Sequence, residues 1–179
     1  MLPAVGAVLL MDSVAPESVR GDSGPALRWY EAGFRGGSSL SRSNDFRQYE
    51  LFAALATPYE WANRSDTLRA RLELQTDAGV LRGNGVTEGI VSAGPAIDFS
   101  SSAAPVALTL GVAPTYLTGR RFGETDFGQR FQFTSSAAFT WMITPDIGLR
   151  YRIQHMSNAR MAAPNPGLDT HSAGIVVAF

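Results

Sequence analysis

The sequence contains no cysteine. This absence excludes disulfide bonds, thiolate metal sites and a cysteine nucleophile, but it does not select a cellular compartment. The sequence also lacks a dense run of basic residues, and its formal net charge is −1. Proteins that bind nucleic acid usually present a strongly basic face, so nucleic acid is not an expected partner.

No stretch of the chain approaches the roughly 20 unbroken apolar residues that a membrane-spanning helix needs. The most apolar segment is 1–11, which is followed by small residues around Val14 and Ala15 and lacks a basic leader. We interpret residues 1–15 as a shortened export signal, with an unstructured start of the chain as the alternative. Residues 16–179, in a chain that is 45% hydrophobic, are then expected to form one domain.

What the sequence does contain is a two-residue alternation of apolar and polar side chains, clearest over 67–75 and 131–141. Glycine, proline, serine, asparagine and aspartate cluster between such runs, and no helical period is convincing. This pattern predicts an all-β protein. Eight strands are expected, at 26–36, 46–57, 67–77, 87–98, 105–116, 128–142, 146–157 and 168–179.

The links between these strands alternate in character. Four are longer and polar or glycine-rich: 37–45, 78–86, 117–127 and 158–167. The other three, 58–66, 99–104 and 143–145, are mostly shorter and carry a proline in or beside them. An even number of strands joined alternately by long and short links is typical of a transmembrane barrel with long outer loops and short periplasmic turns.

A soluble barrel of the lipocalin kind would show the same alternation, so the direction of burial decides between the two. Arg69, Arg71 and Glu73 would be costly in an apolar core but suit a polar lumen, where we expect them to form a salt-bridge network. The sequence therefore predicts an eight-stranded antiparallel up-and-down transmembrane β-barrel with its apolar face outward. The last residue, Phe179, resembles the signal read by the outer-membrane assembly machinery, an expected partner.

A barrel of eight strands is filled by its own side chains, so function is expected on the wall or in the loops. Four aromatic residues suit interfacial belts. They are Trp29, Tyr30, Trp61 and Trp141. Neither metal-ligand spacing nor a phosphate-cradling glycine loop is present, and no metal or cofactor is expected.

The informative segment is 151–171. Tyr151 and Ile153 belong to the apolar, outward set of their strand, and the two-residue period carries His155 and Ser157 onto the same face. In the last strand the same parity turns Asp169 and His171 outward. Antiparallel pairing brings the two sets together, at the extracellular rim if both chain ends lie in the periplasm. Ionisable side chains on a lipid-facing wall are costly except near the interface, so this cluster needs a cause.

These residue types suit a nucleophilic hydrolase. Ser157 would attack, His155 would take its proton, and Asp169 would orient the imidazole. Asn158, or backbone N–H groups near Ala159, would bind the oxyanion. His171 is a rival partner for the serine. Without a function, Ser157-Asn158 and Asp169 would simply be turn residues that end one strand and begin the next.

The run His155-Met156-Ser157-Asn158-Ala159, followed by Pro164-Asn165, Gly167 and an acid at position 169, resembles the active-site signature of the PagL-type lipid A 3-O-deacylases. These are eight-stranded esterases of the Gram-negative outer membrane. The resemblance implies that His155 is the base and Ser157 the nucleophile. Asp169 stands where the best-known form has the longer glutamate. The implied reaction is hydrolysis of the ester-linked 3-hydroxyacyl chain at the 3-position of lipid A, in lipopolysaccharide, without a metal.

Arg160 is expected beside Asn158 and Ala159 on the substrate side of the site, where it could bind lipid A phosphates. Arg120 and Arg121 are better interpreted as solvated loop charges. Two other functions stay open: a non-enzymatic outer-membrane scaffold or adhesin, and a soluble carrier. The sequence is compatible with a homodimer but does not determine the oligomeric state.

Overall fold

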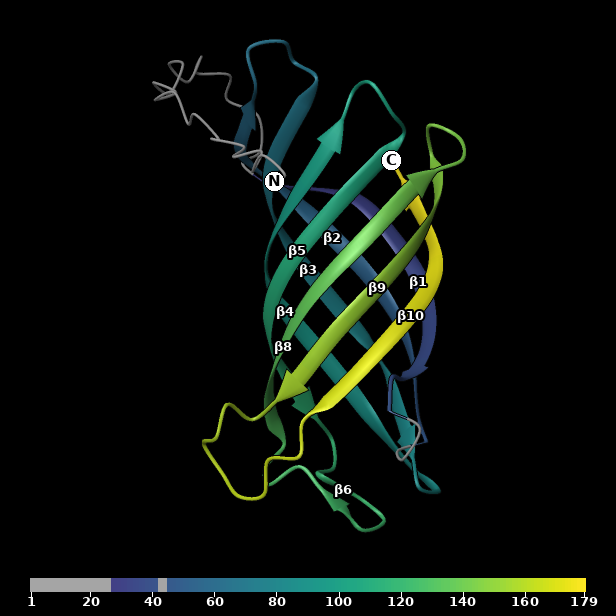
Figure 1. Cartoon of the computed structure of the whole chain (residues 1–179), viewed down its shortest axis with the longest axis vertical. Helices are drawn as coiled ribbons and strands as arrows, with labels where there is room; N and C mark the ends of the chain where they lie inside the picture. Colours follow the sequence, from purple (N-terminus) through teal and green to yellow (C-terminus); the bar gives the residue numbers. More distant parts are fainter. Residues whose placement is uncertain (1–26, 42–44) are drawn as a thin grey trace, which may run out of the picture.

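The structure is a computed structural model that describes residues 27–41 and 45–179. The predicted export signal over 1–15 lies outside the described residues. Eight strands close into an antiparallel barrel in the order β1-β10-β9-β8-β5-β4-β3-β2, which confirms the predicted architecture (Figure 1). None of the described residues belongs to a helix long and apolar enough to span a membrane. The strands are β1 (Arg28–Ser39), β2 (Phe46–Ala62), β3 (Leu68–Gly83), β4 (Val86–Ser101), β5 (Val106–Leu117), β6 (Arg121–Phe122), β7 (Thr125–Asp126), β8 (Phe131–Met142), β9 (Ile147–Ser157) and β10 (Leu168–Ala178).

The start of β1 and the end of β10 lie at the same end of the barrel, where Glu31 pairs with Ala178. The turns after β2, β4 and β8 are at that end too. The loops 118–130 and 158–167 project from the opposite end, and the first of them contains the small β6–β7 hairpin (Figure 1). Closure of the barrel leaves no unpaired sheet edge.

The predicted loop over 78–86 is wrong. Strand β3 continues to Gly83 and β4 starts at Val86, so only Asn84 and Gly85 form the turn. Both have positive φ, 50° and 80°, as a two-residue hairpin turn matched to strand twist requires. A side chain at Gly83 would clash with the ring of Phe46, at 2.4 Å. The glycine that suggested a loop instead makes room for an aromatic ring in the lumen.

The predicted turn over 58–66 is also shorter than expected, because β2 runs on to Ala62. Its pairing with β3 is interrupted between Ala56 and Glu60. Pro58 lies within this interruption. Proline has no N–H to donate to the sheet, so it is tolerated at such an irregularity without ending the strand.

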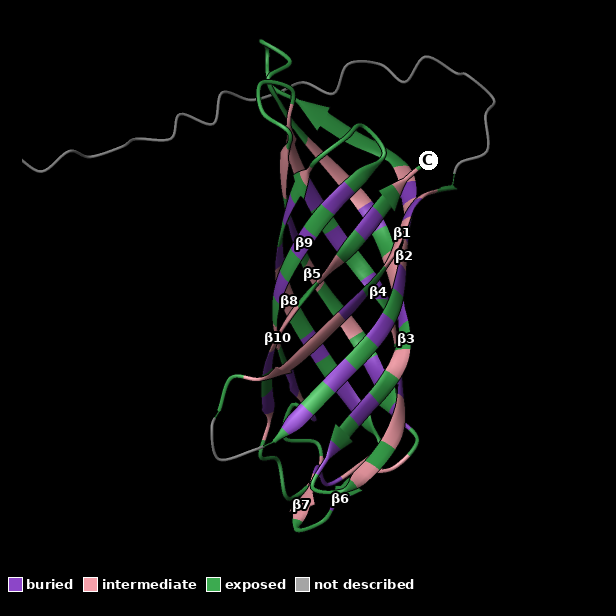
Figure 2. Ribbon diagram, turned by 90° about the vertical axis from the view of Figure 1, so that its right-hand side faces the viewer, coloured by how far each residue is buried: buried purple, intermediate pink, exposed green. Residues whose placement is uncertain are grey.

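Burial follows the two-residue period all round the barrel, visible as alternating bands of buried and exposed residues in Figure 2. Large apolar side chains such as Leu51, Val112 and Ile175 are more than half exposed on the outer wall. Charged and amide side chains such as Glu50, Glu73 and Gln132 are buried in the lumen. A soluble carrier would need the reverse distribution, so the apolar-out arrangement confirms the membrane-barrel prediction.

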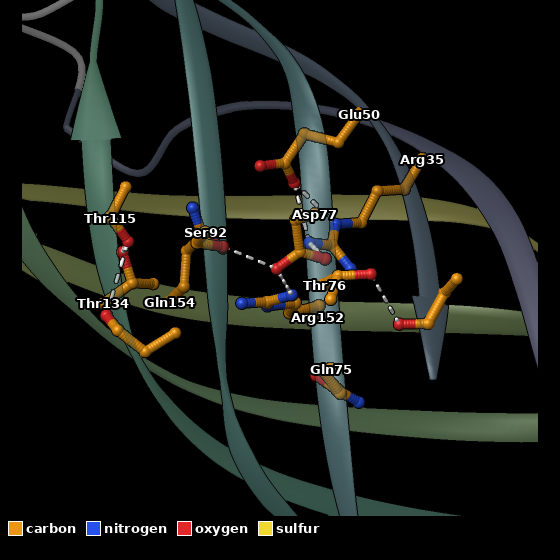
Figure 3. A network of polar contacts seen from close by, with 12 residues as sticks. Arg35, Glu50, Gln75, Thr76, Asp77, Ser92, Thr115, Thr134, Arg152 and Gln154 are labelled. Carbon is orange, nitrogen blue, oxygen red and sulfur yellow. Dashed lines mark hydrogen bonds and ion pairs between the residues drawn. The ribbon is translucent and has the colours of Figure 1, made fainter. Parts of the chain in front are cut away.

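Several buried charges of the lumen are paired with one another (Figure 3). The guanidinium of Arg35 lies 2.7 Å from carboxylate oxygens of both Glu50 and Asp77, and Arg152 contacts the second oxygen of Asp77 at 3.4 Å. Ser92 donates a further hydrogen bond to Asp77 at 2.9 Å. Pairing of this kind offsets the large cost of removing charges from water. The network occupies part of the lumen, as the inward side chains of an eight-stranded barrel do.

The predicted network of Arg69, Arg71 and Glu73 is wrong in its partners. Both arginines bind Glu60, at 3.3 and 3.1 Å, near the end of the barrel where the chain enters and leaves. Glu73 is buried deeper and accepts hydrogen bonds from the Tyr30 hydroxyl and from Gln75.

Tyr30 therefore faces the lumen, and its assignment to an interfacial belt is wrong. The pairing of β1 with β2 shifts between Trp29 and Glu31, and such a bulge turns two successive residues to the same side. The other three aromatics of the predicted belt are about half exposed. They are Trp29, Trp61 and Trp141.

An apolar cluster closes the lumen at the loop end. The rings of Phe122 and Phe127, from the loop 118–130, pack edge to face against Phe46 at centroid distances of 5.4 and 5.9 Å. Met156 and Leu168 join the cluster from inside β9 and β10. These two inward residues anchor the strand ends, so their neighbours His155, Ser157 and Asp169 point outward.

Candidate active site

His155 and Asp169 face each other on the outer wall. They are paired residues of β9 and β10, and His155 Nδ1 lies 2.7 Å from Asp169 Oδ1. Both side chains are more than half exposed. Because Nδ1 is engaged by the carboxylate, the imidazole has Nε2 left to accept a proton from a nucleophile.

Ser157 is the last residue of β9 and lies two positions beyond His155 on the same face. Both residues line an open depression of about 350 Å³, whose other walls come from the following loop. In the part of the chain that the structure describes, the Ser157 hydroxyl makes no hydrogen bond. Catalytic hydrogen bonds are often long in free enzymes and tighten when substrate binds, so the placement suits a nucleophile beside its base.

The loop turns sharply after the serine. Ala159 and Arg160 both have positive φ, 53° and 63°, and the N–H of Met161 donates to the carbonyl of Asn158 at 3.0 Å. A left-handed backbone costs a residue with a side chain roughly 1–2 kcal/mol. Ala159 and Arg160 line the depression, and their N–H groups have no acceptor among the described residues. Two free donors beside a nucleophile suit the binding of an oxyanion.

The side chain of Asn158 does not reach this depression, contrary to the prediction that its amide binds the oxyanion. It is fully buried, and its Nδ2 lies within 3.1 Å of the carbonyl oxygens of Phe127, Ala162 and Pro164. Its backbone N–H donates to Asn165 Oδ1 at 3.0 Å. Asn158 therefore fastens the loop 158–167 to the loop 118–130.

Asn165 has a place in the site that the sequence analysis did not assign. Its carboxamide lines the depression, and because Oδ1 accepts from the Asn158 N–H, Nδ2 is left as a donor. The Pro164-Asn165 pair of the motif was the available signal for it. Gly167 is also required: its φ is +67°, and a Cβ there would lie 3.2 Å from Cε1 of His155.

Replacing Asn158 with alanine should loosen this loop while the barrel stays folded. The change leaves buried carbonyl groups without their donor, at a cost of about 1–3 kcal/mol. Hydrogen exchange should accelerate in 158–167. The matched control is Asn63→Ala, in a turn at the other end of the barrel, which should leave exchange in 158–167 unchanged. Equal protection of this loop in the two variants would contradict the anchoring role.

His171, the rival partner considered for the serine, is not among the residues that line the depression. Its Nε2 is 3.2 Å from the hydroxyl oxygen of Ser38, on β1, and its ring lies 5.9 Å from that of Tyr151.

Arg120 and Arg121 belong to the β6–β7 loop and contact Asp126 at 3.6 and 2.8 Å. The N–H of Gly128, together with these arginines, holds the pKa of Asp126 below its usual value. They are loop charges, as expected. Arg160, by contrast, is exposed at the edge of the depression.

No group of three or more metal-ligating side chains occurs within residues 27–41 and 45–179. The depression is lined by an imidazole, a hydroxyl, an amide and backbone N–H groups, and the Asp169 carboxylate contacts the imidazole from β10. This set suits acyl transfer by a nucleophile, a base and an oxyanion site.

Residues 47–178 of the chain match the protein family described as lipid A 3-O-deacylase (PagL). A lipid A deacylase PagL of Bordetella bronchiseptica is 39% identical over 61 residues, which make up 33% of this chain and 33% of that protein. The match thus spans about a third of that relative's length. A crystal structure of the outer membrane enzyme PagL has the same fold, with a TM-score of 0.68 at 18% identity, covering 83% of this chain and 99% of that one.

Proposed function

Since the chain belongs to the lipid A 3-O-deacylase (PagL) family, we propose that it is a serine esterase that hydrolyses the ester-linked 3-hydroxyacyl chain at the 3-position of lipid A. The chain is an outer-membrane β-barrel. The loop end that carries His155 and Ser157 is then the extracellular end, where the outer leaflet holds lipid A.

The observation that carries this proposal is the 2.7 Å contact between His155 and Asp169 on the lipid-facing wall, with Ser157 in the same depression. The barrel does not need this pair for stability, since the lumen network and the apolar cluster hold the strands from inside. Exposed histidine–carboxylate pairs contribute little to folding. A pair at the level of lipid head groups, beside a free hydroxyl, is instead suited to chemistry on a lipid ester.

In the proposed mechanism Ser157 Oγ attacks the ester carbonyl while His155 Nε2 takes its proton. Asp169 stabilises the resulting imidazolium through Nδ1. The N–H groups of Ala159 and Arg160, with Nδ2 of Asn165, bind the developing oxyanion.

The C–O bond to the sugar then breaks, and His155 returns the proton to the departing sugar hydroxyl. Water, deprotonated by the same imidazole, hydrolyses the acyl-serine and releases the 3-hydroxy fatty acid. The substrate reaches the site by lateral diffusion, because the lumen is filled and closed. Recognition by the assembly machinery and a homodimeric state remain predictions.

The test is the lipid A of a Gram-negative host with and without this chain. Expression should lower the mass of lipid A by one 3-hydroxyacyl chain and release the corresponding free acid, both measurable by mass spectrometry. A scaffold or adhesin would leave the lipid A spectrum unchanged while the barrel accumulates in the outer membrane, and that outcome would refute the esterase proposal.

A further inference from the structure

A row of polar residues crosses the outer wall beside the proposed active site. His171 on β10 pairs with Ser38 on β1, Ser38 pairs with Arg47 on β2, and Arg47 pairs with Arg82 on β3. All four have the outward parity of their strands. Neighbouring strands lie about 4.8 Å apart, so the row extends roughly 14 Å from His171 to Arg82. Asp169 is two residues from His171, so the row begins next to the proposed triad.

The row ends in two arginines that directly oppose each other. Side chains at such paired positions have Cβ atoms about 4.5–5.5 Å apart, and like charges there destabilise the sheet. The carboxylate nearest to Arg47 is that of Asp45, at 3.7 Å, with both side chains more than 60% exposed. Arg82 makes no ion pair or hydrogen bond with the described residues. Pairs so exposed contribute little, so among the described residues the exposed Asp45 offsets only a small part of the mutual repulsion.

The arginines of the lumen, unlike Arg47 and Arg82, are buried and have close carboxylate partners. Arg35, Arg150 and Arg152 are buried, and each contacts at least one carboxylate at 2.6–3.4 Å. The fold therefore neutralises guanidinium groups where it encloses them. On the outside it places Arg47 and Arg82 together, and among the described residues only the exposed Asp45 pairs with either of them.

The position of Arg47 and Arg82 along the barrel axis indicates which part of the membrane they contact. The outward residues one step toward the membrane are Tyr49 and Val80, both more than 40% exposed and paired with each other. Arg47 and Arg82 lie one residue from the loop-side ends of β2 and β3. They are thus at the border between the apolar band and the extracellular side, where the phosphorylated head groups of outer-leaflet glycolipids lie.

We propose that Arg47 and Arg82 together bind a phosphate group of the glycolipid substrate, and so hold its head group while an acyl ester occupies the depression at Ser157. The inference rests on the proposed function for the identity of that lipid. Guanidinium groups bind phosphate through paired, charge-assisted hydrogen bonds, which an ammonium cannot do. The chain has 15 arginines and no lysine.

Binding should be measured on the folded full chain in detergent, with Ser157→Ala as background so that no substrate is consumed. The probes are lipid A with its phosphates and the same lipid A after enzymatic dephosphorylation. The double variant Arg47→Ala/Arg82→Ala should weaken binding of the phosphorylated lipid at least tenfold and leave binding of the dephosphorylated lipid unchanged. Arg47→Lys/Arg82→Lys should recover only part of the affinity.

The matched control is Arg28→Ala/Arg64→Ala, which removes two exposed arginines at the opposite end of the barrel and should leave both affinities unchanged. Equal affinity of the Arg47/Arg82 variant and its parent for phosphorylated lipid A would overturn the proposal. An equal loss of affinity for the phosphorylated and the dephosphorylated lipid would also overturn it, since the pair would then not recognise phosphate. Displacement of the lipid by equimolar inorganic phosphate would show a free-phosphate site instead.

The two proposals fail separately. If wild-type protein leaves lipid A intact but phosphate-dependent binding persists, the esterase proposal fails and the phosphate site stands. If deacylation occurs but binding ignores the arginines, only the phosphate site fails. When Arg47→Ala/Arg82→Ala is made in the wild-type background, with Ser157 intact, KM for phosphorylated substrate should rise. The value of kcat should stay nearly unchanged, because the two arginines do not touch the reacting atoms.

Discussion

Deacylation of lipid A should be lost when Ser157 is replaced with alanine. In a serine protease triad, removal of the nucleophile lowers kcat about 10⁶-fold, because the covalent step disappears and base and carboxylate have nothing to activate. The measurement is the rate of 3-hydroxy fatty acid release from purified lipopolysaccharide by the detergent-solubilised barrel. Far-UV circular dichroism checks that the β-structure is retained, which is expected because the Ser157 hydroxyl makes no hydrogen bond with the described residues.

Ser135 provides the matched control. It lies on β8, directly opposite His155 and on the same outward face. It is a serine hydroxyl beside the same imidazole, but it does not line the depression formed by the loop. Ser135→Ala should therefore keep the wild-type rate. If Ser135→Ala abolished release and Ser157→Ala did not, the nucleophile would be on the neighbouring strand and the proposed oxyanion donors would be misassigned.

Asp169→Asn should have the second largest effect. The amide can no longer stabilise the imidazolium and can hold the ring in the wrong tautomer, a change that lowers kcat about 10⁴-fold in a serine protease triad. The structure shows the contact that would be lost, 2.7 Å from His155 Nδ1 to Asp169 Oδ1. A fall in kcat with unchanged KM is expected, because Asp169 acts through His155 and not on the substrate.

Two further variants make this prediction specific. Asp169→Glu keeps the charge and should retain much more activity than Asp169→Asn. His171→Ala removes the other ionisable outward group of β10, which binds Ser38, and should leave kcat unchanged. If Asp169→Asn left kcat unchanged and His171→Ala abolished activity, His171 and not Asp169 would be the residue that supports His155.

Much of this site follows from one periodicity. The alternation in residues 147–157 and 168–178 predicts which side chains face outward, and antiparallel pairing places His155 opposite Asp169. The same rule predicts the polar lumen. It does not place Arg82, which lies in the predicted loop 78–86, so the pairing of Arg82 with Arg47 does not follow from the sequence.

The errors lie where the period is interrupted. The bulge at Trp29 turns Tyr30 inward, and Gly79 and Gly83, which are typical of loops, instead belong to a strand. In the loop 158–167 no period applies, since the left-handed turn at Ala159 and Arg160 decides which amide reaches the depression. Asn158 and Asn165 are the same residue type, and only tertiary contacts show that Asn158 fastens the loop while Asn165 lines the depression.

The closed, salt-bridged interior has a consequence for kinetics. Under the proposed function, substrate is encountered only in the plane of the leaflet, so saturation is governed by the number of lipid A molecules per unit area, not per unit volume. The fatty acid is released into the same two-dimensional phase and competes there for the outer wall. Turnover should thus depend on how tightly neighbouring lipids are packed, and an assay in dilute micelles samples a different regime from the bacterial surface.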